Sequence, residues 1–225
     1  MSGLKQIQYG VGDNGIQATP DELDMYQHEH ILHPGVGAAS IGTAAGTQGS
    51  GGMAPLVTDL DYPRNVLVTV INGAGTAMGG TVVVYGQDQF GGTQTETIAV
   101  ASVDPGGTTA GTLIFSRIGT MTYTKVATLG TVNVGYAIGT TSGIAALFGL
   151  SNRIASTDDI KRGTWIDNDV AKQLAREGSA PAVFGLVNRS AVRIEVAGGI
   201  AAADSFVITY KPTKDLSSQG YQAGL

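Results

Sequence analysis

The chain has 225 residues and a formal net charge of −5, with 34 glycines, no cysteine and 14% charged residues. A chain without cysteine forms no disulfide and no thiolate metal site, and this acidic balance argues against binding nucleic acid through its phosphates. No segment has the long apolar run that a membrane helix needs, and no basic segment followed by an apolar one opens the chain. We therefore expect a soluble, unexported protein without nucleic-acid or membrane partners.

Residues 1–60 are predicted to form an extended N-terminal arm. They show no sustained hydrophobic period of either a strand or a helix. Within them, residues 35–52 consist almost wholly of Gly, Ala, Ser and Thr, which offer little apolar surface to bury. We expect a partner to order this arm.

Residues 61–211 change to short apolar or alternating runs separated by glycine-rich turns, the pattern of antiparallel strands. The sequence therefore predicts a mainly β fold, either an antiparallel β-sandwich or a barrel-like domain, because periodicity does not specify strand order. The last two runs are predicted to pair as a closing hairpin, and residues 212–225 to form a polar tail. The predicted strands are 65–71, 81–86, 95–100, 112–118, 121–127, 131–136, 191–196 and 205–211.

Residues 151–181 are the most polar stretch and are interpreted as an insertion in the β domain. One short helix is predicted at Asn168–Arg176, with Asp167 or Asn168 as its N-cap. Asp158 and Asp159 offer paired carboxylates for acid/base chemistry or calcium binding. Their spacing matches neither a calcium loop nor a glycosidase pair, so capping and solvated charge explain these acidic residues better.

A set of short motifs occurs between residues 64 and 150. The motifs are Gly80–Asp88, Gly91 and Thr95–Ile98, Phe115 and Ile118, Val132–Gly135, and Gly149–Leu150. Together they resemble a recurrent pattern in virion proteins of phages and prophages, the capsid decoration or cement-like proteins of tailed bacteriophages. The resemblance implies a place in the head or its decoration and transfers no catalytic residue. The arm and the 151–181 insertion lie outside it.

Two glycine-rich turns lie near the first of these motifs. Gly86–Gly92 is predicted to be the turn of a hairpin, with Glu96 on the outward face of the returning strand. Gly73–Gly80 resembles a dinucleotide-binding loop, but such a loop opens a helix, and here a strand follows at once. A hairpin turn is the preferred interpretation of that segment too.

His28, His30 and His33 are the weak candidates for a metal site. Together with Glu29 they place three imidazoles and a carboxylate within six residues. A closed tetrahedral site would need a symmetry mate or Glu29, so polar contacts of the arm are the preferred interpretation. An inter-subunit metal or a proton-sensitive clasp is the alternative, and no cofactor is expected.

No catalytic set is expected, because no nucleophile elbow or phosphate loop occurs and all three histidines lie in the arm. The single tryptophan, Trp165, is either a local anchor or a contact to a neighbouring subunit. The candidate interaction residues are Tyr26, His28, His30, Leu32 and Trp165.

The sequence thus favours a non-enzymatic capsid decoration or cement protein on the surface of a virion, assembled in the host cytoplasm. Its expected partners are the major capsid protein and copies of itself, with a trimer as one option. In that hypothesis the arm bridges subunits and stabilises the capsid through many weak contacts. The alternatives are a neck, tail or head-fibre base protein, or a carbohydrate-binding or adhesive β-module for host attachment.

Overall fold

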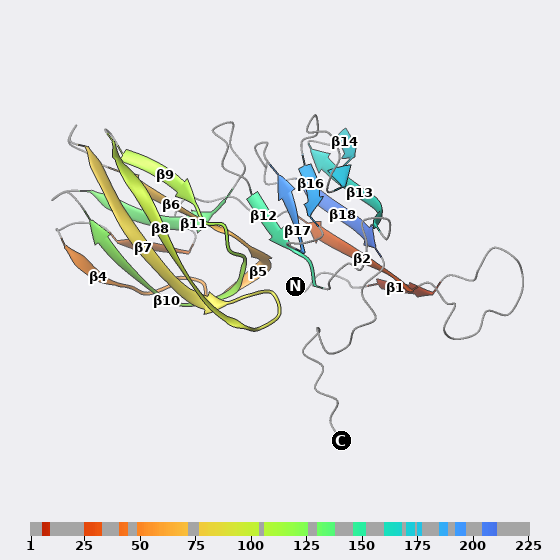
Figure 1. The fold of residues 1–225 in the computed structure, drawn as a ribbon, viewed down its shortest axis with the longest axis horizontal. Helices are drawn as coiled ribbons and strands as arrows, with labels where there is room; N and C mark the ends of the chain where they lie inside the picture. Colours follow the sequence, from red (N-terminus) through yellow and green to blue (C-terminus); the bar gives the residue numbers. More distant parts are fainter. Residues whose placement is uncertain are drawn as a thin grey trace, which may run out of the picture. The chain divides into compact units, whose positions relative to one another are not determined.

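A computed structural model describes the fold and divides the chain into two compact units (Figure 1). Unit 1 comprises residues 1–34, 150–195 and 203–225, and unit 2 comprises residues 35–149 and 196–202. No helix in the described part of the chain is long and apolar enough to cross a membrane. The described residues are 6–9, 25–32, 41–44, 49–71, 77–103, 106–125, 130–137, 146–151, 160–167, 170–173, 175–176, 185–188, 192–196 and 204–210.

Unit 2 is built from two sheets in which neighbouring strands run antiparallel. One has the order β12 (Ala146–Gly149), β5 (Asp59–Arg64), β10 (Phe115–Lys125), β7 (Met78–Gln87) and β8 (Thr93–Val103), and β4 (Ser50–Met53) also pairs with β10. The other has the order β3 (Gly42–Ala44), β11 (Thr131–Tyr136), β6 (Val66–Ile71) and β9 (Gly106–Ala110). The predicted mainly β fold is confirmed.

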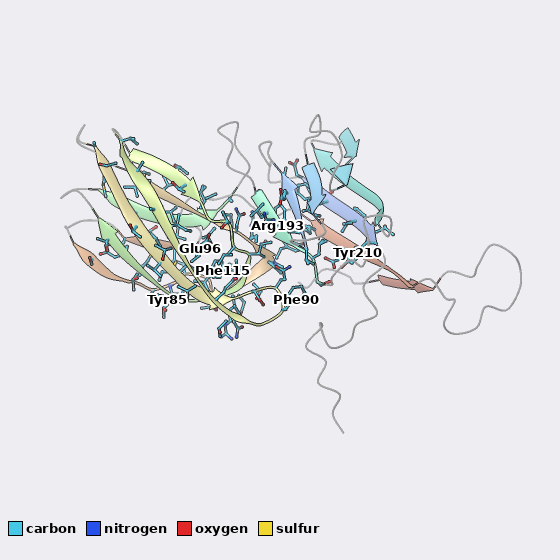
Figure 2. The ribbon with its side chains drawn as sticks, viewed as in Figure 1. Tyr85, Phe90, Glu96, Phe115, Arg193 and Tyr210 are labelled. Carbon is cyan, nitrogen blue, oxygen red and sulfur yellow. The ribbon has the colours of Figure 1, made fainter. Side chains whose placement is uncertain are left out.

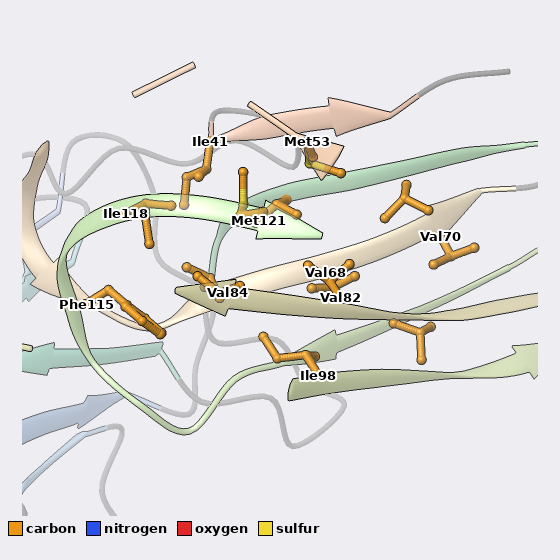
Figure 3. Close-up of a cluster of buried hydrophobic side chains, with 14 of the residues drawn as sticks. Ile41, Met53, Val68, Val70, Val82, Val84, Ile98, Phe115, Ile118 and Met121 are labelled. Atoms are coloured by element: carbon orange, nitrogen blue, oxygen red, sulfur yellow. The ribbon is translucent and has the colours of Figure 1, made fainter. Parts of the chain in front are cut away.

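The core of unit 2 draws apolar side chains from both sheets (Figure 3). Alternate residues of each strand face it, since side chains of a strand point to opposite faces in turn. Val66, Val68 and Val70 of β6 are buried in this way, and so are Val82 and Val84 of β7. The other buried members are Ile41, Met53, Leu60, Met78, Ile98, Val100, Phe115, Ile118, Met121, Val132 and Val134.

The two sheets of unit 2 are joined at Arg64 and Asn65, where β5 ends and β6 begins. Arg64 is fully buried, with its guanidinium carbon 4.2 Å from the ring centroid of Tyr136 and 5.1 Å from that of Phe148. Its Nη2 also donates to Ala137 O at 3.4 Å. Stacked aromatic faces compensate part of the desolvation of a buried cation. Burial still lowers the pKa of Arg64 to about 10, although the charges of Asp61 and Tyr136 act in the opposite direction.

Asn65 completes this corner by bonding to two other parts of the unit. Its Nδ2 donates to Gly111 O at 2.8 Å, and its Oδ1 accepts from Leu147 N at 2.9 Å. Its own backbone N–H donates to Leu147 O at 3.2 Å. Because the Asn65 side chain is almost fully buried, these bonds satisfy backbone groups that water does not reach.

The Gly86–Gly92 segment is the turn of the β7–β8 hairpin, as the sequence predicts. Asp88 Oδ1 accepts from both Phe90 N and Gly92 N at 2.8 Å. Gly91 has a φ of +86°, a conformation that a residue without a side chain adopts freely. The turn is therefore specified by an aspartate and a glycine at fixed spacing.

Unit 1 contains a sheet with the order β1 (Gln6–Tyr9), β2 (Met25–Leu32), β18 (Ser205–Tyr210), β13 (Ile160–Asp167) and β14 (Val170–Gln173). β15 (Ala175–Arg176), β16 (Gly185–Asn188) and β17 (Arg193–Val196) are hydrogen-bonded neighbours in that order, and β15 pairs with β16 in parallel. Buried apolar side chains of unit 1 include Ile31, Leu150, Ile194, Phe206, Ile208 and Tyr210.

The structure corrects three local predictions. The segment predicted as a helix, Asn168–Arg176, instead contributes strands β14 and β15, because pairing with β13 overrides its helix propensity. β17 and β18 do not form a hairpin, since β18 lies between β2 and β13. The Gly73–Gly80 connection leads from β6 in one sheet to β7 in the other, so it is not a hairpin turn, although a strand does follow it as predicted.

The N-terminal segment, predicted to be an extended arm, contains strands. Residues 1–60 include β1–β4 and the start of β5, and strands β1 and β2 pair with each other and with β18. Ile41 and Met53 are buried in the core of unit 2. In the glycine-rich stretch that contains β3 and β4, single apolar residues carry no period, so the sequence pattern did not reveal these two strands.

We predict that Asn65→Ala lowers the free energy of unfolding of unit 2 by about 2–5 kcal/mol, because it leaves the buried Leu147 N–H and Gly111 C=O without their side-chain partner. Circular dichroism during chemical denaturation measures the loss. Trp165 belongs to unit 1, so its fluorescence reports that unit separately. The control Asn133→Ala removes only the exposed bond from Thr43 Oγ1 and should cost about 1 kcal/mol or less. Equal losses in the two variants would contradict the role of Asn65.

We also predict that Tyr136 ionises late as pH rises. Burial and the negative charge of Asp61 raise the pKa of Tyr136 above the usual 10.0, and Arg64 lowers it by less. The folded state therefore keeps this proton longer than the unfolded state does, and its contribution to stability is lost above pH 10. The difference in tyrosinate absorbance between wild type and Tyr136→Phe should have a midpoint above 10. A midpoint at or below the ordinary value would disprove this environment.

Candidate interaction surface

The candidate interaction residues of the N-terminal segment all lie on β2. Across the sheet, His28 pairs in register with Thr209, His30 with Val207 and Leu32 with Ser205 of β18, while Tyr26 pairs with Gln8 of β1. For these four, the structure describes the backbone and not the side chains. His33 lies outside the described residues. Within the part of the chain that is described, no group of three His, Cys, Asp or Glu side chains could hold a metal ion.

Trp165 lies on β13, on the other side of β18 from β2. It pairs in register with Phe206 of β18 and with Lys172 of β14. Its backbone therefore belongs to the same sheet as the candidates of β2, and β18 lies between them. The sequence did not indicate this proximity, because more than 100 residues separate the two strands in the chain.

Glu29 links three parts of unit 1. In the sequence it stood out only as a possible metal ligand beside the histidines. Its Oε1 accepts hydrogen bonds from Ser151 N at 2.9 Å, from the Ser151 hydroxyl and from the Tyr210 hydroxyl. Tyr210 is drawn in Figure 2. A carboxylate with this many donors is strongly stabilised as an acceptor. These hydrogen bonds connect β2, β18 and the segment after β12, so Glu29 stabilises the fold of unit 1.

The sequence prediction that Glu96 lies on the outward face of its strand is wrong. Glu96 lies opposite Val84 and shares the inner face of β8 with Ile98 and Val100. Its Oε1 accepts from Thr112 N at 2.5 Å, from Thr112 Oγ1 at 3.1 Å and from Leu113 N at 3.2 Å. The inward carboxylate thus accepts hydrogen bonds from the loop before β10 and fixes its conformation.

The outer face of the sheet formed by β4, β10, β7 and β8 carries a set of uncharged side chains, most of them Ser or Thr, and the exposed pair Arg117 and Asp59 lies at one end of it. We call this set the hydroxyl face. Cross-strand pairs align its residues in rows, as in Thr122–Val83–Thr97 and Thr124–Thr81–Ala99. All its members are exposed or half-buried. They are Ser50, Thr81, Val83, Tyr85, Thr95, Thr97, Ala99, Thr120, Thr122 and Thr124.

The hydroxyl face can make polar contacts without removing a charge from water. Each hydroxyl both donates and accepts, so it suits a partner that presents either kind of group. Ser50 Oγ and Thr124 Oγ1 already share such a bond at 3.1 Å. Tyr85, which is 42% exposed, adds an aromatic ring (Figure 2). The face is therefore a candidate surface for a broad, uncharged contact.

No protein-family model, curated protein or solved structure matches the chain.

We predict that Glu96→Ala lowers the free energy of unfolding of unit 2 by about 1–3 kcal/mol, because Thr112 N–H and Leu113 N–H lose their acceptor. Hydrogen exchange of these two amides should accelerate in the variant. Glu96→Gln keeps an acceptor oxygen, so it should show a smaller change. As a control, Glu195→Ala removes a carboxylate that pairs with Arg193 at 2.8 Å and should leave the exchange of both amides unchanged. Unaltered exchange in Glu96→Ala would disprove this role.

Proposed function

We propose that the chain is a structural protein of a tailed-bacteriophage particle that decorates the outside of the head and stabilises it. Its partners would be the major capsid protein and further copies of itself. Two kinds of support exist: the resemblance of residues 64–150 to virion proteins, and the hydroxyl face of unit 2. The hydroxyl face is the observation that carries the proposal.

The hydroxyl face suits repeated docking on a shell for a physical reason. A contact made of Thr and Ser side chains avoids the desolvation cost of buried charges. One such contact is weak, but a shell presents many equivalent sites, and linked contacts reinforce one another. A net charge of −5 keeps the free protein soluble while the contact itself stays neutral.

Several polar side chains inside the units bind the chain's own backbone groups. Asn65, Glu96 and Asp88 each bind backbone groups of unit 2. Glu29 does the same in unit 1. These side chains fix loops and strand ends, so their chemistry supports the fold.

The subunit-bridging role proposed for the N-terminal segment can be tested with a short deletion. β1 is an edge strand of its sheet, so removing residues 1–10 takes away one outer strand. Deleting residues 1–60 would instead remove β2, which pairs with β18, and the buried Ile41 and Met53. The shorter deletion separates loss of bridging from loss of the fold.

We predict saturable co-sedimentation of the full chain with purified tailless bacteriophage heads. Thr97→Lys and Thr122→Lys should each weaken this binding by roughly tenfold or more, because each buries an unpaired charge in the contact. Both residues are exposed, so the fold should tolerate the changes. Thr108→Lys, on β9 of the other sheet, is the matched control and should bind as wild type does.

The alternative outcomes distinguish the rival functions. Binding to tails and not to heads would reject decoration and indicate a neck, tail or head-fibre base protein. Binding to neither would reject a role in the particle. Equal binding by all three lysine variants would show that the hydroxyl face is not the docking surface.

A further inference from the structure

A hollow of about 350 Å³ opens on unit 2 between β7 and β10. It is lined by Tyr85, Gly86, Gln87, Arg117, Gly119 and Thr120. The hollow coincides with a bulge in β10: Ile118 pairs with Gly86 and Thr120 pairs with Tyr85, so Gly119 has no partner residue opposite it. Such bulges re-aim neighbouring side chains and interrupt the regular surface of a sheet.

The two glycines of the hollow differ in whether a side chain could replace them. A Cβ at Gly86 would collide with Arg117 O and meet Phe115 Cδ1 at 2.9 Å, so close packing of the strands demands glycine there. A Cβ at Gly119 would meet only Tyr85 O, at 3.4 Å, which is ordinary contact. Neither packing nor the need for a positive φ explains the glycine at position 119. Its effect is to leave the hollow open.

The walls of the hollow offer an aromatic face beside several hydrogen-bonding groups. Tyr85 is 42% exposed, and Gln87 and Thr120 provide an amide and a hydroxyl. Arg117 Nε lies 3.4 Å from Asp59 Oδ1, and both side chains are largely exposed. An ion pair this open to water contributes little to stability, so both groups can bind a ligand at small cost.

The surroundings narrow the class of ligand. β7 and β10 are each paired on both sides, so a peptide cannot add to them as a further strand. The chain's net charge of −5 and the carboxylate of Asp59 disfavour anionic ligands, nucleic acids among them. A neutral sugar ring fits the remaining chemistry, because its C–H face stacks on an aromatic ring while its hydroxyls bind amide, guanidinium and carboxylate groups.

We propose that this hollow binds a neutral pyranose unit of a glycan, with Tyr85 as the stacking platform and Gln87, Thr120, Arg117 and Asp59 as hydrogen-bonding groups. The sugar unit occupies the space that the missing side chain of Gly119 leaves open. Tyr85 and Thr120 also belong to the hydroxyl face, so a bound glycan would cover part of the surface proposed to dock on the head. Glycan binding and head binding are measured separately, so either proposal can fail without the other.

The test uses the full chain and a panel of immobilised neutral oligosaccharides ending in glucose, galactose, mannose or N-acetylhexosamine. Wild type should bind at least one member of the panel. Tyr85→Ala should weaken that binding by roughly tenfold or more, since it removes the stacking platform. Phe90→Ala is the matched control, because Phe90 is an aromatic residue of similar exposure, 36%, that does not line the hollow; it should bind as wild type does.

Gly119→Val is a second variant, and it separates loss of binding from loss of the fold. A valine fills the hollow and favours the strand conformation, so thermal stability should be kept or raised while binding falls below detection. Amide signals of residues 85–87 and 117–120 should shift when the bound oligosaccharide is titrated into wild type. The proposal is overturned if wild type binds no neutral oligosaccharide, or if Tyr85→Ala and Gly119→Val bind as well as wild type.

Discussion

The buried corner at Arg64 and Asn65 is the constraint on which unit 2 depends. Arg64 ends a strand of the first sheet and Asn65 leads directly into a strand of the second, so the corner fixes where the chain crosses between them. A buried guanidinium is costly by itself, and the rings of Tyr136 and Phe148 offset part of that cost from β11 and β12. Asn65 adds bonds to Gly111 and Leu147. Three separate segments, at β11, β12 and Gly111, are thereby positioned by two adjacent side chains.

The same logic recurs wherever a polar side chain is drawn into either unit. Glu96 holds the loop before β10, Asp88 holds the β7–β8 turn, and Glu29 holds the segment at Ser151. Each accepts hydrogen bonds from backbone donors and so fixes the conformation of a loop or turn. Polar groups that remain available for partners lie on the outer surface, in the hydroxyl face and around the bulge of β10. The architecture thus separates groups that maintain the fold from groups that can meet another molecule.

Much of unit 2 could be predicted from the sequence, because its strands bury one face and therefore alternate. The runs at 65–71, 81–86, 95–100 and 131–136 correspond to β6, β7, β8 and β11. The predicted runs 112–118 and 121–127 are one strand, β10, with a bulge at Gly119 that looks like a break in the pattern. β9 was missed because its segment, GGTTA, is composed of turn-like residues and has no buried apolar side chain.

The candidate sites were harder to predict, because each depends on partners distant in the chain. Glu96 sits between two threonines, and alternation alone does not say which face of the strand is the inner one. Its inward position follows from the loop at Thr112, which the sequence does not place nearby. Arg64 gives no signal that it will be buried, since Tyr136 and Phe148 follow it by more than 70 residues. The hollow requires a register shift that periodicity cannot express.

The corner at Arg64 and Asn65 also has a mechanical consequence. Hydrogen bonds between neighbouring strands can open one after another like a zipper when a sheet is pulled from its edge. At the corner, by contrast, two adjacent residues bond to three different parts of the unit, at Gly111, Leu147 and Ala137. We therefore expect tension applied at this corner to load several bonds at once instead of opening them one after another.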